Sequence, residues 1–129
     1  MNYPTFKNLQ LGSGATYDNV QVRASVYTDN GNATLHLLDP GSFEPIAVAT
    51  VNMDVKLYGY DLHIKDWSEN EGIFDWLVLQ GIVLPAPEID CFNGHVTAKG
   101  AVLANDALIE QLEASRAQWQ DAEAGHFNI

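Results

Sequence analysis

The chain has 129 residues, and its 17 acidic and 6 basic side chains give a formal net charge of −11. This charge argues against direct binding to nucleic acid or to an anionic membrane, because both are contacted mainly through Lys and Arg. A hydrophobic content of 47 % allows a buried core, and the single cysteine, Cys91, excludes an internal disulfide and indicates a reducing compartment.

For a chain of this length we expect one domain over residues 1–129. The sequence opens without a charged segment followed by an apolar run, so no secretion signal is expected. No apolar run approaches the roughly 20 residues that are needed to cross a bilayer. These features predict a cytosolic protein without a membrane partner.

The N-terminal half of the sequence predicts an antiparallel sheet. Residues 1–18 read as a lead-in arm that is interrupted by Gly12-Ser13-Gly14. Beyond the arm, apolar and polar residues alternate with the period of a half-buried strand, and residues 28–32 (Thr-Asp-Asn-Gly-Asn) are typical of a tight hairpin turn. A four-stranded meander is therefore expected, with strands over residues 20–26, 33–38, 46–51 and 57–64.

A helix with signals at both ends is predicted between Ser68 and Gly81. Ser68 and Glu71 have the spacing of a capping box, in which each side chain binds a free N–H of the first turn. Gly81 stands where a left-handed residue commonly ends a helix. The segment 73–79 is apolar except for Asp75, so we expect this helix to be buried at the centre of the fold.

The C-terminal part is predicted to form a short hairpin and a second helix. Residues 89–92 and 95–98 flank an Asn-Gly turn. Asn105 is a candidate N-cap for an amphipathic helix over residues 106–121, and residues 124–129 are expected to form a frayed tail. The fold class is therefore α+β: an antiparallel meander and a short hairpin pack on a buried central helix, and an amphipathic helix ends the chain.

No set of side chains has the spacing of a metal-binding motif. Asp66-x-Ser68-x-Asn70 begins like a calcium loop, but such a loop needs Gly at its sixth position and a carboxylate at its twelfth, where this chain has Glu71 and Leu77. The 4 histidines include no pair at i and i+4. We expect no metal site and no cofactor.

One enzymatic interpretation rests on Cys91 and His95, which could form a nucleophile and its base across the predicted hairpin. Free Cys is commonly a small apolar core residue, which favours a structural role for Cys91. We therefore expect a protein that is not an enzyme.

Residues 65–73 (Lys-Asp-Trp-Ser-Glu-Asn-Glu-Gly-Ile), followed by Leu77 and Gly81-Ile82-Val83, resemble a family of small proteins of unknown function found in conjugative elements and phages. The resemblance is strongest over residues 60–85, is weaker over residues 30–51, and does not extend to the last 30 residues. It implies an accessory gene of mobile DNA whose product works in the cytosol of the host cell. It assigns no role to any residue.

This context and the acidic composition predict a protein that binds and inhibits a host defence protein of the anti-restriction or anti-CRISPR kind. Its acidic surface would occupy a basic channel in a nucleic-acid-binding nuclease complex. The charged content of 18 % is low for a surface that imitates DNA. The expected contact residues are Asp66, Glu69, Glu71, Asp75, Asp106, Glu110, Glu113 and Asp121. The alternative is a structural adaptor of the mobile element that forms a homodimer and inhibits nothing.

Overall fold

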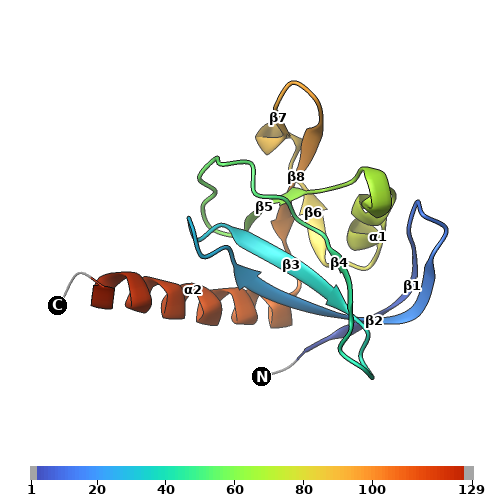
Figure 1. The fold of residues 1–129 in the computed structure, drawn as a ribbon, viewed down its shortest axis with the longest axis horizontal. Coiled ribbons are helices and arrows are strands. Elements are labelled where there is room, and N and C mark those ends of the chain that lie inside the picture. Colours follow the sequence, from blue (N-terminus) through green and yellow to red (C-terminus); the bar gives the residue numbers. More distant parts are fainter. Residues whose placement is uncertain (1–2, 127–129) are drawn as a thin grey trace.

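The computed structural model describes residues 3–126 and has the predicted α+β class (Figure 1). Its strands form two antiparallel sheets, and a long helix ends the described chain. In chain order the elements are β1 (Thr5–Gln10), β2 (Thr16–Val26), β3 (Ala33–Leu38), β4 (Pro45–Val48), β5 (Asp61–Ile64), the 3-10 turn η1 (Ser68–Asn70), α1 (Ile73–Leu79), β6 (Val83–Pro85), the 3-10 turn η2 (Pro87–Ile89), β7 (Cys91–Phe92), β8 (Thr97–Leu103) and α2 (Asp106–His126).

The first sheet is a meander in the order β1–β2–β3–β4. Its longest strand, β2, pairs with β1 through residues 16–21 and with β3 through residues 21–26. The expectation that residues 1–18 form only a lead-in arm is therefore wrong for residues 5–10 and 16–18. A residue outside the sheet also holds β1 in place: the Trp76 indole of α1 donates to the Lys7 carbonyl at 2.9 Å and packs edge-on against Phe6.

The second sheet has the order β5–β8–β6, with β7 paired to the start of β8. The prediction that residues 57–64 form the fourth strand of the first meander is wrong, because β5 pairs with β8. An isolated bridge between Thr50 and Ile64 connects the two sheets. The expected hairpin before the last helix is present as β7 and β8, and β8 continues to Leu103 as the central strand of the second sheet.

The start of α1 differs from the predicted capping box. Ser68 has a positive φ of 58° and begins η1, and it does not cap α1. The cap comes from Asp66, whose Oδ1 accepts the backbone N–H groups of Gly72 at 3.1 Å and Phe74 at 2.9 Å. The local turn at Ser68 brings Asp66 to the helix end, where a carboxylate also meets the positive end of the helix dipole.

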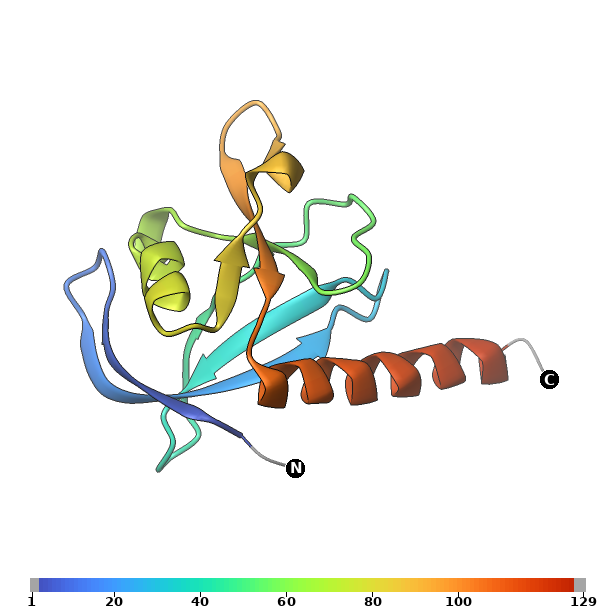
Figure 2. The same cartoon turned by 180° about the vertical axis from the view of Figure 1, so that it is seen from behind.

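The predicted stop at Gly81 is confirmed. Gly81 has φ +73°, its N–H binds the Val78 carbonyl, and the next N–H, of Ile82, reaches back to Leu77 at 3.0 Å. The helix itself is only 7 residues long and lies beside β1 and β6 rather than at the centre of the fold (Figure 2). Ile73, Trp76 and Leu77 are buried, whereas Leu79 is 81 % exposed, so the expected central burial of this helix is wrong for the face that carries Leu79.

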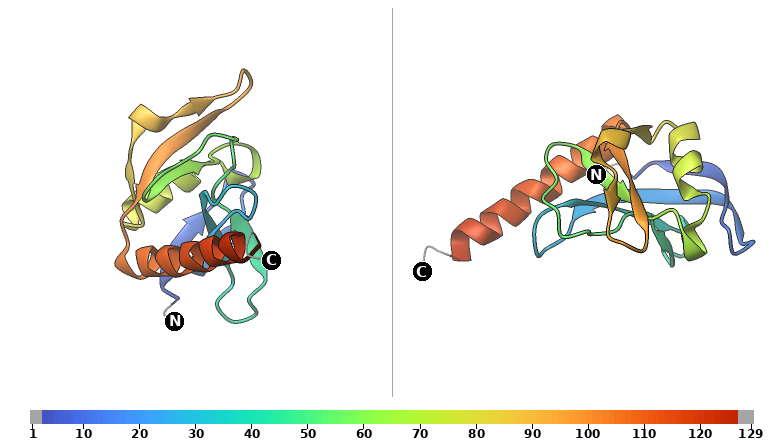
Figure 3. Two further views of the ribbon diagram at one scale, coloured as in Figure 1. Left: turned by 90° about the vertical axis from the view of Figure 1, so that its left-hand side faces the viewer. Right: turned by 90° about the horizontal axis from the view of Figure 1, so that it is seen from above.

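One hydrophobic core lies between the two sheets and the two helices (Figure 3). Alternate residues of β2 and β3 point into it, as expected for strands with one buried face. Its fully buried members include Leu35 and Leu37 from the first sheet, Leu62 and Ile64 from the second, Ile73 and Leu77 from α1, and Leu108 and Leu112 from α2. No helix of the described residues is long and apolar enough to cross a membrane.

The last helix, α2, begins as predicted, with the Asn105 side chain accepting the Leu108 N–H at 3.1 Å. It runs beside β2 as far as the β2–β3 turn, where the Trp119 indole donates to the Thr28 carbonyl at 2.9 Å. Its final turns continue beyond the sheets (Figure 1). The tail was expected to begin at residue 124. The backbone of residues 124–126 continues α2, and residues 127–129 lie outside the described part of the chain.

Candidate functional site

The acidic residues around α1 are largely engaged within the protein. Asp66 is only 13 % exposed, and its Oδ2 forms an ion pair of 2.9 Å with Lys99 on β8 in addition to capping α1. Glu69 forms an ion pair of 2.6 Å with Lys65, and the hydrogen bond from Lys65 is the main reason that the pKa of Glu69 is lowered to about 2. Glu71 and Asp75 are exposed. Two of the four predicted contact residues in this region are therefore already paired with a lysine.

The four predicted contact residues on α2 lie along one face of the helix, which we call the acidic stripe: Asp106, Glu110, Glu113 and Asp121. All four are exposed. At 3.6 residues per turn they fall within an arc of roughly 80° and extend over about 22 Å of the helix. None forms an ion pair with a described residue, and Glu113 accepts a hydrogen bond from the Tyr60 hydroxyl at 3.2 Å.

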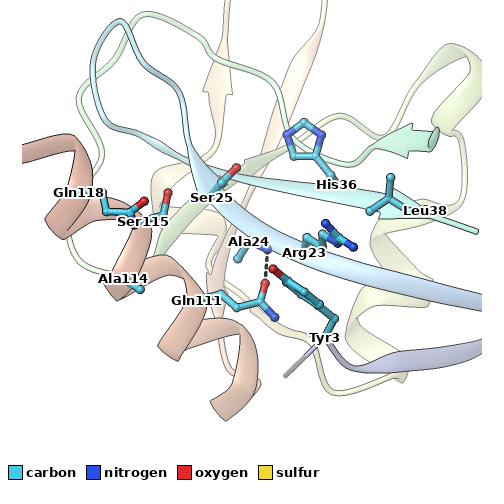
Figure 4. Close-up of a pocket in the computed structure, with 10 residues that line it drawn as sticks. All are labelled: Tyr3, Arg23, Ala24, Ser25, His36, Leu38, Gln111, Ala114, Ser115 and Gln118. Atoms are coloured by element: carbon cyan, nitrogen blue, oxygen red, sulfur yellow. Dashed lines mark hydrogen bonds between the residues drawn. The ribbon is translucent and has the colours of Figure 1, made fainter. Parts of the chain in front are cut away.

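A groove lies between α2 and the outer face of the first sheet (Figure 4). Its volume is about 510 Å³. Arg23, Ser25 and His36 reach it because they alternate with core residues along β2 and β3. The groove is lined by Tyr3, Arg23, Ala24, Ser25, His36, Leu38, Gln111, Ala114, Ser115 and Gln118, and none of these ten residues is acidic.

Arg23 is held in a defined position at the edge of this groove. Its Nε donates to Gln21 Oε1 at 2.7 Å. Its guanidinium carbon lies 4.1 Å from the centre of the Tyr3 ring and 5.5 Å from that of the Phe43 ring. Guanidinium groups stack favourably on aromatic faces, so these contacts restrict the side chain to few conformations.

His36 lies directly opposite Arg23 in the register of β2 and β3. Burial lowers the pKa of His36 below its usual value of 6.5. The imidazole is therefore mainly neutral at pH 7, and the guanidinium of Arg23 is the permanent positive charge of the groove.

Gln111 closes the base of the groove between β2 and α2. Its Oε1 accepts the backbone N–H of Ala24 at 2.9 Å. This N–H points away from β3, on the side of β2 where the pairing with β1 has ended. The buried Gln111 side chain thus replaces a neighbouring strand at this position.

Cys91 and His95, the pair that could act as a nucleophile and its base, are not joined by a hydrogen bond. Cys91 is half-buried in β7, whereas His95 is exposed in the turn that follows, where its backbone N–H binds Asn93 Oδ1. His63 is buried, and its Nε2 lies 2.8 Å from the Ile89 carbonyl oxygen, while its Nδ1 has no partner. Over the described part of the chain, no three His, Cys, Asp or Glu side chains gather in a way that could hold a metal ion.

The groove was not predicted from the sequence, although part of the signal was present. The alternation along residues 20–26 already places Arg23 on the outer face, and the turn at residues 28–32 sets a register that brings His36 opposite to it. The contribution of α2 has no local signal, because its residues follow Arg23 by about 90 positions. Comparisons with protein-family models, with curated proteins and with solved structures gave no match.

Proposed function

We propose that this protein acts by binding another protein through the acidic stripe of α2, and that the partner is a host defence protein that cuts or binds nucleic acid. The stripe would occupy a basic channel of that partner and exclude its substrate. The supporting observation is the placement of four exposed carboxylates on one face of a helix that continues beyond the sheets.

The charges of the stripe support this proposal more than those near α1 do. Asp66 and Glu69 already have lysine partners, so a new partner would have to compete with Lys99 and Lys65. The four carboxylates of the stripe have no such competitor among the described residues. Rows of exposed like charges accelerate association with an oppositely charged surface and make binding sensitive to salt.

The test uses two variants that each remove four negative charges. The stripe variant carries Asp106→Asn, Glu110→Gln, Glu113→Gln and Asp121→Asn. The control variant carries Asp18→Asn, Glu44→Gln, Asp54→Asn and Glu88→Gln, at exposed positions outside α2 that are not among the expected contact residues. Both variants therefore have the same net charge, and they differ only in where the charges are lost.

Purified restriction endonucleases and RNA-guided nucleases are assayed for cleavage of a plasmid in the presence of each protein. We expect the native protein and the control variant to inhibit at least one nuclease, and the stripe variant to be at least roughly tenfold weaker. Inhibition should also weaken between about 50 and 300 mM salt. Equal losses in the two variants, or no inhibition of any nuclease, would contradict the proposal. A stable dimer in sedimentation together with no inhibition would favour the adaptor alternative.

A further inference from the structure

The groove between β2, β3 and α2 has a charge opposite to that of the molecule as a whole. The chain has 17 acidic and 6 basic residues, yet the groove is lined by Arg23 and by no carboxylate. A surface that attracted cations would be expected to include some of the many acidic side chains. The composition of the lining therefore favours a negatively charged ligand.

We propose that this groove binds the carboxylate group of an organic ligand, with Arg23 as the residue that anchors it. The carboxylate belongs either to a free small molecule or to the C-terminus of a peptide. This site shares no residue with the acidic stripe, which borders it through Glu110 and Asp121, one turn from Ala114 and Gln118. The two proposals can therefore fail independently.

The geometry of Arg23 fits this role. Its Nε is used by Gln21, and Tyr3 and Phe43 flank the guanidinium. Among the described residues, neither of its two terminal nitrogens has a hydrogen-bond acceptor. A fixed guanidinium with free terminal donors binds the two oxygens of a carboxylate in parallel and loses little conformational entropy when it does so.

The other polar groups of the groove are neutral and can complete the binding of a single negative charge. Ser25 on β2 and Ser115 on α2 place hydroxyl groups on opposite walls, and His36 adds an imidazole (Figure 4). A phosphate monoester carries nearly two negative charges and would meet only one permanent positive charge here. The match in charge therefore favours a carboxylate over a phosphate.

The remaining lining suits the organic part of such a ligand. Ala24, Leu38 and Ala114 provide apolar contacts, and the Tyr3 ring provides an aromatic one. The volume of about 510 Å³ is within the range of sites that bind small molecules. Because the groove is open to solvent and has one charged anchor, we expect dissociation constants on the order of 1 mM for simple probes.

The test follows backbone amide signals by ¹H–¹⁵N NMR while probes are added to the whole protein. The probes are benzoate, benzamide, phenyl phosphate, and the dipeptide N-acetyl-Ala-Leu with a free or an amidated C-terminus. We expect benzoate or the free dipeptide to shift the signals of Ala24, Ser25, His36 and Gln118 in a saturable way. The two amides should bind at least roughly tenfold more weakly. Tighter binding of benzoate would identify a small molecule as the source of the carboxylate, and tighter binding of the dipeptide would identify a chain end.

Three variants connect the binding to Arg23. Arg23→Gln should weaken benzoate at least roughly tenfold, whereas Arg116→Gln, which removes a cation outside the groove, should leave it unchanged. Ser115→Glu provides a variant that leaves the packing of Arg23 intact, and its added carboxylate should compete with the ligand and abolish binding. Equal binding of benzoate and benzamide, tighter binding of phenyl phosphate, or full binding by Arg23→Gln would overturn the proposal.

Discussion

Asp66 and Lys99 are 33 residues apart in the chain, and their ion pair of 2.9 Å connects the start of α1 to the central strand of the second sheet. The same carboxylate caps the helix through its other oxygen. Asp66 thus performs two structural tasks that its position in the sequence does not reveal.

Removal of this carboxylate should have a large effect on stability. We expect Asp66→Ala to lower the free energy of unfolding by about 2 to 3 kcal/mol, because it removes a helix cap and leaves Lys99 without its partner. Glu69→Ala removes an exposed ion pair and should have a much smaller effect on the free energy of unfolding. Urea denaturation of the two variants measures both values. Equal losses would show that the cap contributes nothing beyond an ordinary surface pair.

The pKa of Glu69 offers a direct check of the pair with Lys65. NMR titration of the native protein should give a pKa of about 2, and Lys65→Met should move it back toward 4.5. Because the folded value lies below the unfolded one, the stabilising effect of the pair is complete above pH 4.5 and is lost as the pH falls toward 2. Lys7→Met removes a lysine elsewhere and should leave the pKa of Glu69 unchanged.

The burial of His36 should make stability depend on pH near neutrality. Its pKa in the folded protein lies below 6.5, so the unfolded chain takes up a proton first as the pH falls. The contribution of His36 to the free energy of unfolding should therefore decrease from just above pH 6.5 down to the folded pKa. Urea denaturation at a series of pH values measures this decrease, and it should be smaller in His36→Gln. An NMR pKa at or above 6.5 would contradict the assigned burial.

Two glycines should respond differently to replacement by alanine. A Cβ on Gly100 would lie 2.2 Å from the Ala86 carbonyl oxygen and 2.5 Å from Ile89 Cγ1, so η2 would have to move. A Cβ on Gly81 would meet no atom within 4 Å, and only its positive φ opposes the change. We expect thermal denaturation to show a loss of about 1 kcal/mol for Gly81→Ala and about 2 to 3 kcal/mol for Gly100→Ala. The opposite order would show that backbone strain outweighs the steric conflict.

Elements with a local signal could be predicted from the sequence, and elements that depend on distant residues could not. The alternation along β2 and β3 and the cap at Asn105 are local, and both were predicted. The strand β1 mixes polar residues without clear alternation and includes Asn8 at φ +60°. It is held by Trp76, 69 positions further along the chain, so no window of sequence around it could indicate a strand.

The same reasoning separates the two groups of acidic residues. From the sequence alone, the acidic residues around α1 and those of the acidic stripe look equivalent, because each group lies at or near a predicted helix. Lys99 pairs with Asp66 only through the fold, whereas the helical period alone places the acidic stripe on one face. The groove required both kinds of information: the hairpin register for Arg23 and His36, and the tertiary position of α2 for its opposite wall.

The backbone pairing that connects the two sheets is short: it is the isolated bridge between Thr50 and Ile64. On either side of it, the Val51 N–H binds the His63 carbonyl at 3.0 Å and the Lys65 N–H binds the Ala49 carbonyl at 2.9 Å. These two bonds can break while each sheet keeps its own ladder intact. The amide hydrogens of Val51 and Lys65 therefore report directly on separation of the layers. If the two sheets separate before the protein unfolds, these two amides should exchange with heavy water faster than the amides inside β2. If the sheets separate only on complete unfolding, the two sets of amides should exchange at similar rates.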